Sequence, residues 1–165
     1  MSAARIFVVG VGNIFLGDDG FGVEVATRMR RRPVPDGVRV EEYGIRGVHL
    51  AYALLEGGFD LVVLVDTLDV GEEPGAVSVF ESELGDAGEV LPDAHDLDPA
   101  SVMGLLAGLG GSVGRMLVVG CQPSNLEERI GLSPAVEAAV EEAITVVEEL
   151  VQEQLSTYIG KEHRT

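Results

Sequence analysis

The sequence predicts an α/β fold: a single-domain three-layer sandwich with a mostly parallel, twisted sheet of about five strands and helices on both faces. Short apolar runs typical of strands alternate along the chain with segments that place apolar residues at helical spacing. The runs 6–9 and 61–65 are apolar at every position, as in strands that are covered on both faces. No repeat or low-complexity linker interrupts this order, and 165 residues suit one domain spanning 1–165.

The elements follow from local signals in chain order. Strands are expected over 6–9, 38–43, 61–65, 76–80 and 116–120. The first helix places Phe21, Val25, Ala26 and Met29 on one face and ends in an arginine-rich turn before Pro33. A short helix follows over 49–55, and another starts from Asp98 as N-cap with Pro99 at its first position.

A long last helix is expected to start at Ser133–Pro134. Its apolar face comprises Val136, Val140, Ile144, Val147 and Val151. Residues 81–97 are expected to form an acidic loop, and residues 156–165 a frayed tail.

Composition excludes several classes of function. Eleven basic against 28 acidic residues give a net charge of −17, which repels phosphate backbones and anionic membranes, so neither nucleic acid nor membrane is an expected partner. The only lysine, Lys161, lies in the expected tail, which excludes phosphate-loop and Schiff-base chemistry. The single cysteine, Cys121, excludes a disulfide framework. Without a membrane span or signal peptide, we expect a soluble, cytoplasmic protein, and no feature indicates an obligate oligomer rather than a monomer.

Polar residues follow the expected strands at the edge where parallel sheets bind ligands. Asp18 and Asp19 lie in a glycine-rich loop after the first strand, Asp66 ends the third strand, and His95 precedes a helix. Carboxylates 4 Å apart repel by about 4 kcal/mol at an effective dielectric near 20. Protonation, a nearby arginine such as Arg46, or a divalent metal would relieve that repulsion. With a histidine in the set, nickel, zinc, manganese or iron is the more economical explanation, and the other two stay open.

Short motifs lie in a fixed order from about residue 5 to the last helix. They are Gly10-Val11-Gly12-Asn13, Gly17-Asp18-Asp19-Gly20-Phe21-Gly22, Leu64-Val65-Asp66, His95, Gly120-Cys121-Gln122-Pro123 and Ile130-Gly131-Leu132-Ser133-Pro134. In this order they resemble the [NiFe]-hydrogenase maturation endopeptidases. The resemblance implies a protease that trims the C-terminal extension of a hydrogenase large-subunit precursor after nickel insertion.

The resemblance also implies roles for individual residues. Asp19, Asp66 and His95 match the metal-binding positions of that family, and as catalytic residues they would capture the nickel carried by the precursor. Zinc or cadmium could substitute for nickel. Asn13 and Arg46 are candidates for binding the substrate. The first ligand is often glutamate in the family, whereas here it is an aspartate, and the segment 43–47 departs from the family's Gly-Gly-Thr.

Simpler explanations compete with these assignments. Asp18 is expected to cap the first helix, His49 to be structural or exposed, and Cys121 to fill space, although a thiol nucleophile with His95 as base stays open. Phe15 replaces the third glycine of a dinucleotide fingerprint. The serine-elbow pattern at 110–114 lies between a helix and a strand, the wrong order for a hydrolase. The alternatives to a protease are a nickel-sensing chaperone and a small nucleotide- or flavin-binding module.

Overall fold

A computed structural model describes residues 5–82 and 99–162 of the chain. Five strands form one sheet in the order β2-β1-β3-β5-β4. Their bounds are β1 Ile6–Val11, β2 Val38–Gly44, β3 Leu61–Thr67, β4 Val77–Ser82 and β5 Met116–Cys121. Strands β2, β1, β3 and β5 are parallel, and β4 pairs with β5 in the antiparallel direction. The expected mostly parallel five-stranded sheet is therefore confirmed.

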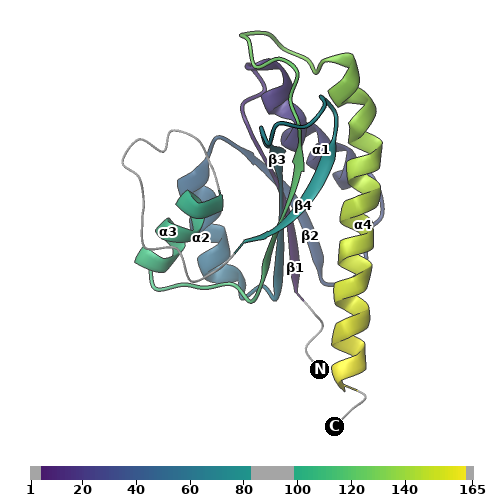
Figure 1. Ribbon diagram of the computed structural model, residues 1–165. Helices are drawn as coiled ribbons and strands as arrows, with labels where there is room; N and C mark the ends of the chain where they lie inside the picture. Colours follow the sequence, from purple (N-terminus) through teal and green to yellow (C-terminus); the bar gives the residue numbers. More distant parts are fainter. Residues whose placement is uncertain (1–4, 83–98, 163–165) are drawn as a thin grey trace.

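The described part of the chain also contains four α-helices and one short 3-10 helix. They are η1 Gly17–Gly20, α1 Phe21–Arg30, α2 Gly47–Gly57, α3 Pro99–Gly108 and α4 Pro134–Glu162. Helices α1 and α4 cover one face of the sheet, and α2 and α3 cover the other (Figure 1). The three-layer sandwich with helices on both faces is confirmed. No helix within 5–82 and 99–162 is long and apolar enough to cross a bilayer.

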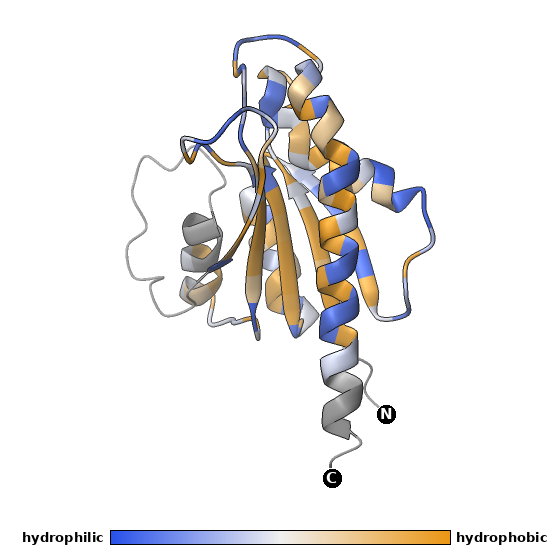
Figure 2. Cartoon of the chain, turned by 45° about the vertical axis from the view of Figure 1, so that its right-hand side comes forward, coloured by the Kyte–Doolittle hydropathy of each residue, from blue (hydrophilic) through white to orange (hydrophobic). Residues whose placement is uncertain are grey.

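Alternation along the strands builds two cores from one sheet. In β1, Ile6 and Val8 point into the core beneath α1 and α4, whereas Phe7 and Val9 point into the core beneath α2 and α3. The predicted apolar face of α4 is buried at all of its five positions, which are Val136, Val140, Ile144, Val147 and Val151. Figure 2 shows this as an orange stripe on α4 facing the sheet, with a blue face turned outward. Apolar burial thus fixes the position of the last helix.

The structure differs from the expected elements mainly at their ends. Residues 81–82 belong to β4 and not to the acidic loop, and the rest of that loop, with His95 and Asp98, lies outside the described residues. The last helix continues to Glu162, so residues 156–162, which we expected in a frayed tail, are helical.

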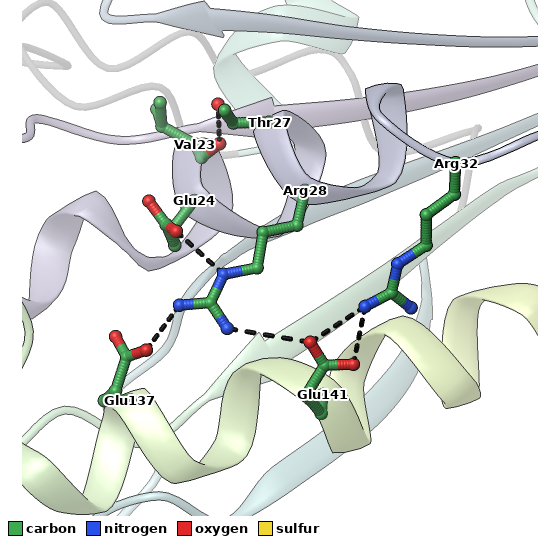
Figure 3. A network of polar contacts seen from close by, with 7 residues as sticks. All are labelled: Val23, Glu24, Thr27, Arg28, Arg32, Glu137 and Glu141. Atoms are coloured by element: carbon green, nitrogen blue, oxygen red, sulfur yellow. Dashed lines mark hydrogen bonds and ion pairs between the residues drawn. The ribbon is translucent and has the colours of Figure 1, made fainter.

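An ion-pair network joins α1 to α4 on the outer side of the sandwich (Figure 3). The guanidinium of Arg28 donates to Glu24 at 2.8 Å within α1 and to Glu137 of α4. Glu141 accepts two 2.8 Å hydrogen bonds from Arg32 and lies 3.7 Å from Arg28. The hydrogen bonds with Glu137 and Glu24 raise the pKa of Arg28, and the hydrogen bond from Arg32 lowers the pKa of Glu141. These ion pairs therefore support the packing of α1 on α4 from the solvent-exposed side of the hydrophobic core.

We expect Arg28→Ala to lower the free energy of unfolding by about 1 kcal/mol, because it removes the residue that bonds to both helices. The difference should shrink in 1 M salt, where the screening length is about 3 Å. Urea unfolding at low and high salt measures both effects, with Arg31→Ala on the same helical turn as control. An Arg28 variant as stable as the protein itself at low salt would contradict this role.

Candidate active site

The candidate site lies at the topological switch point of the sheet, where successive strands are added on opposite sides of β1. From β1 the chain continues through α1 to β2 on one side, and β3 lies on the other side of β1. The loops that leave β1 and β3 therefore diverge at this point of the carboxyl edge, where doubly wound sheets bind ligands, and we call this point the opening between β1 and β3. Asp19 follows β1 in η1, and Asp66 is the sixth residue of β3. Figure 1 shows the loops after β1, β3 and β5 at the same end of the molecule.

Two glycines allow the first loop to lie against the strand ends. A Cβ atom at Gly22 would lie 2.1 Å from the carbonyl oxygen of Val65 and 2.4 Å from that of Val11. Gly12 has φ of +135°, and a Cβ there would lie 1.9 Å from the carbonyl oxygen of Asp19 and 3.6 Å from Asp66 Oδ1. Both positions exclude any side chain. The two glycines therefore hold η1 and the start of α1 against the ends of β1 and β3.

Thr67 connects the two carboxylates. Its hydroxyl donates to Asp19 Oδ1 at 3.0 Å, and its backbone N–H donates to Asp66 Oδ1 at 2.7 Å. The other oxygen of Asp19 accepts a 2.8 Å hydrogen bond from the backbone N–H of Asn13. Asp19 and Asp66 are distant in sequence, but both of their carboxylates accept a hydrogen bond from Thr67. Sequence reasoning missed Thr67, although its position directly after Asp66 was an available signal.

Asp19 in η1 and Asp66 in β3 offer carboxylate oxygens as ligands at the carboxyl edge of the sheet. Two carboxylates at one edge can hold a cation or share a proton, and oxygen donors suit a divalent metal. Within 5–82 and 99–162, no group of three histidine, cysteine or acidic side chains could hold a metal. His95, the third expected ligand, lies outside those ranges. The described residues therefore contribute a pair of carboxylates that fits part of a metal site.

The two expected substrate-binding residues lie at the same edge and help to build it. The Asn13 side chain accepts a 2.9 Å hydrogen bond from the N–H of Phe15, which shapes the first loop. Arg46 donates to the carbonyl oxygens of Tyr43 and Glu42 at 3.1 and 3.0 Å and lies over the Tyr43 ring. The N–H of Gly12 bonds to the carbonyl of Gly44 at 2.9 Å, so segment 43–46 lies beside the first loop. Whether Asn13 and Arg46 bind substrate stays a prediction.

Asp18 does not cap the first helix, and that expectation was wrong. Neither η1 nor α1 has a side-chain cap. The Asp18 side chain is fully buried and accepts hydrogen bonds from the backbone N–H groups of Ser124, Asn125 and Ser133 at 2.8, 2.8 and 2.6 Å. The Ser133 hydroxyl donates a fourth at 2.9 Å. Asp18 therefore anchors the loop after β5, and Asp19 alone of the two acids lies beside Asp66.

Burial would raise the pKa of Asp18, but the three backbone hydrogen bonds and that of the Ser133 hydroxyl together lower it. A carboxyl whose pKa is lower in the folded state stabilises the fold at pH above its ordinary value of about 3.9. That contribution is lost as the pH falls through the lower, folded-state pKa. The anchor is therefore fully formed at neutral pH and weakens only in acid.

We expect Asp18→Asn to lower the free energy of unfolding by about 3 kcal/mol at pH 7, because an amide places a donor among four donors. Denaturant unfolding at pH 7 and pH 3 measures the loss, which should be smaller at pH 3. Asp36→Asn, at an exposed position before β2, is the control. If the Asp18 variant were as stable as the unaltered protein at pH 7, the proposed role of Asp18 as an anchor of the loop after β5 would be wrong.

The simple assignments of Cys121, His49 and residues 110–114 agree with the structure. Cys121 is fully buried in the core beneath α1 and α4, and burial, followed by the charges of Asp18 and Glu142, raises its pKa to about 11. A neutral, enclosed thiol is a poor nucleophile, which favours its expected space-filling role. His49 is exposed on α2. Residues 110–114 lie between α3 and β5, the order that excludes a serine elbow.

We expect no alkylation of Cys121 in the folded protein at pH 8, because its pKa of about 11 keeps the thiol neutral and its side chain is enclosed. Iodoacetamide labelling followed by mass spectrometry measures this, with the protein in 6 M guanidinium as positive control. Rapid labelling of the folded protein would revive the thiol-nucleophile alternative.

Comparison with known proteins identifies the family. The family model described as hydrogenase maturation protease matches residues 23–150, which include Asp66 and His95 but begin after Asp19. The chain belongs to the hydrogenase maturation protease family. A putative hydrogenase maturation protease of Methanocaldococcus jannaschii is 32% identical over 151 residues, covering 89% of this chain and 96% of that protein. The hydrogenase 2 maturation protease of Escherichia coli is 32% identical over 148 residues, covering 87% and 88%.

Solved structures of hydrogenase maturation proteases have the same fold. The hydrogenase maturating endopeptidase HybD of E. coli superposes with a TM-score of 0.77 at 31% identity, covering 91% of this chain and 93% of that one. The resemblance inferred from the motifs is confirmed, and the chain is a hydrolase of the endopeptidase type. This replaces both alternatives, the nickel-sensing chaperone and the nucleotide- or flavin-binding module.

Proposed function

We propose that this maturation protease removes the C-terminal extension of a [NiFe]-hydrogenase large-subunit precursor after nickel has been inserted. The observation that carries the proposal is the pair of carboxylates, Asp19 and Asp66, that Thr67 links at the opening between β1 and β3. Two further features support it: the membership in the maturation protease family and an edge assembled from the loops after β1, β2 and β3.

In this proposal Asp19, Asp66 and His95 bind the nickel that the precursor carries, so that only a loaded precursor is held in position. The nickel is part of the substrate and, when bound, would polarise the scissile carbonyl. Zinc or cadmium would take its place in a binding assay, because carboxylate and imidazole ligands suit each of them. Asn13 and Arg46 would contact the peptide on either side of the opening.

Hydrolysis requires a group that accepts a proton from the attacking water and returns it to the leaving amine. The carboxylates of Asp19 and Asp66 are the candidates for this exchange at the rim. The water oxygen first adds to the carbonyl carbon as its proton passes to a carboxylate, and the C–N bond then breaks as that proton is returned to the leaving amine. Thr67 would hold Asp19 in position during these steps.

We further propose that the protein acts in the cytoplasm as a monomer, without nucleic acid or membrane. The net charge of −17 supports the last two statements, because such a surface repels phosphate backbones and anionic lipids. The precursor is then the partner that the candidate site faces.

We expect Asp66→Asn to fold normally and to lower processing by at least about 100-fold, because the amide cannot act as an anionic ligand or a base. Mass spectrometry of a nickel-loaded precursor incubated with each protein measures removal of the extension. Asp60→Asn is a matched control, because Asp60 precedes β3 at the opposite edge, where its exposed carboxylate accepts a 2.9 Å hydrogen bond from the Arg5 N–H.

Two outcomes would contradict the proposal. Normal processing by the Asp66 variant would remove this carboxylate from the reaction. Binding of the loaded precursor by the unaltered protein with no change in precursor mass would exclude removal of an extension.

A further inference from the structure

Four large apolar side chains are exposed beside the candidate site, on the loops that follow β1 and β5. We call them the rim patch: Ile14, Phe15, Leu126 and Ile130, with exposed fractions of 44%, 60%, 50% and 74%. Single exposed apolar residues are common and need no explanation, but a group of them on adjoining loops is a mark of an interaction site.

Backbone hydrogen bonds join the two loops that carry the rim patch. The N–H of Gly17 donates to the carbonyl of Arg129 at 2.8 Å, and the N–H of Arg129 donates to that of Phe15 at 3.0 Å, so Leu16 and Arg129 form a short parallel bridge. The N–H of Asp18 donates to the carbonyl of Asn125 at 2.9 Å. Phe15 makes one of these bonds itself, and Ile14, Leu126 and Ile130 each directly neighbour a residue that makes one.

The Asp18 anchor fixes the same loops from inside the protein. Its carboxylate holds Ser124, Asn125 and Ser133, which flank Leu126 and Ile130 on both sides. The exposed side chains thus stand on backbone that is bonded at several points. A preformed apolar surface loses little conformational freedom on binding, which favours association with a protein partner.

The rim patch is continuous with the candidate site. Asn13, whose N–H bonds to Asp19, directly precedes Ile14. A Cβ atom at Gly20 would lie 3.2 Å from the Cα of Ile14, so Ile14 lies against the residue after Asp19. The patch therefore lies within reach of a polypeptide whose scissile bond is at Asp19 and Asp66.

Charge around the patch limits the chemistry of its partner. Glu127, Glu128 and Arg129 are all exposed between Leu126 and Ile130, so this interval carries two negative charges and one positive charge in a chain with a net charge of −17. An acidic partner would be repelled, whereas an apolar surface flanked by basic residues fits both the side chains and the charge.

We propose that the rim patch is the docking surface for the large-subunit precursor, which would lay an apolar segment flanked by basic residues across Phe15 and Ile130. This inference rests on the proposed function, since it takes the precursor as the protein that the site acts on. The patch would supply binding, and the carboxylates of Asp19 and Asp66 would take part in the reaction.

The test uses the double variant Phe15→Ser/Ile130→Ser and the control Val34→Ser. Val34 is 40% exposed and lies before β2, at the opposite edge of the sheet. Processing of the nickel-loaded precursor is followed by mass spectrometry over a range of precursor concentrations. We expect the double variant to raise KM by about tenfold or more with kcat unchanged within about twofold, because buried apolar anchors dominate protein interfaces. The control should match the unaltered protein.

Each alternative result has a defined meaning. An unchanged KM in a folded double variant overturns the docking surface while the proposed function stands, provided that the unaltered protein processes the precursor. No processing by the unaltered protein overturns the proposed function itself. If sedimentation shows a dimer that the double variant converts to a monomer, the patch binds a second copy of this chain and the proposal is wrong.

Discussion

Close backbone packing at the start of α1 is the constraint on which the candidate site depends. The helix begins against the carbonyl oxygens that end β1 and β3, and Gly22 leaves no space there for a side chain. This contact brings η1 over the opening in the sheet, so that Asp19 reaches the hydroxyl of Thr67. The two carboxylates lie close together because this packing fixes the start of α1 against the ends of β1 and β3. A side chain at Gly22 would push the start of α1 away from the strand ends and so move Asp19 away from Thr67 and Asp66.

Two neighbouring aspartates in η1 have opposite environments. Asp18 points inward, where four hydrogen bonds satisfy a fully buried carboxylate. Asp19 points to the rim, where Asn13 and Thr67 bond to it. One short turn of 3-10 helix therefore joins the part of the molecule that stabilises the fold to the candidate site. A shift of this turn would alter both at once.

Sequence patterns predicted most of the fold because burial leaves a periodic signal. The strands β1 and β3 and the apolar face from Val136 to Val151 could be predicted directly, because the spacing of their apolar residues indicates which sides of each element are buried. The Asp18 anchor could not be read, because it joins residues 115 positions apart through backbone N–H groups that no residue type reveals. Thr67 was missed for a related reason: a threonine at a strand end is ordinary until the fold brings Asp19 to it. His95 stays a prediction from motif order.

The direction of α4 separates the edge that carries the candidate site from the far end of the molecule. The helix starts beside Ser133, which bonds to Asp18, and its 29 residues extend for roughly 43 Å away from that edge. The start of β1 lies at the far end as well (Figure 1). A fluorophore or solid support coupled near Glu162 would therefore leave the opening between β1 and β3 accessible. Immobilised protein could then capture large client proteins without steric interference from its own attachment.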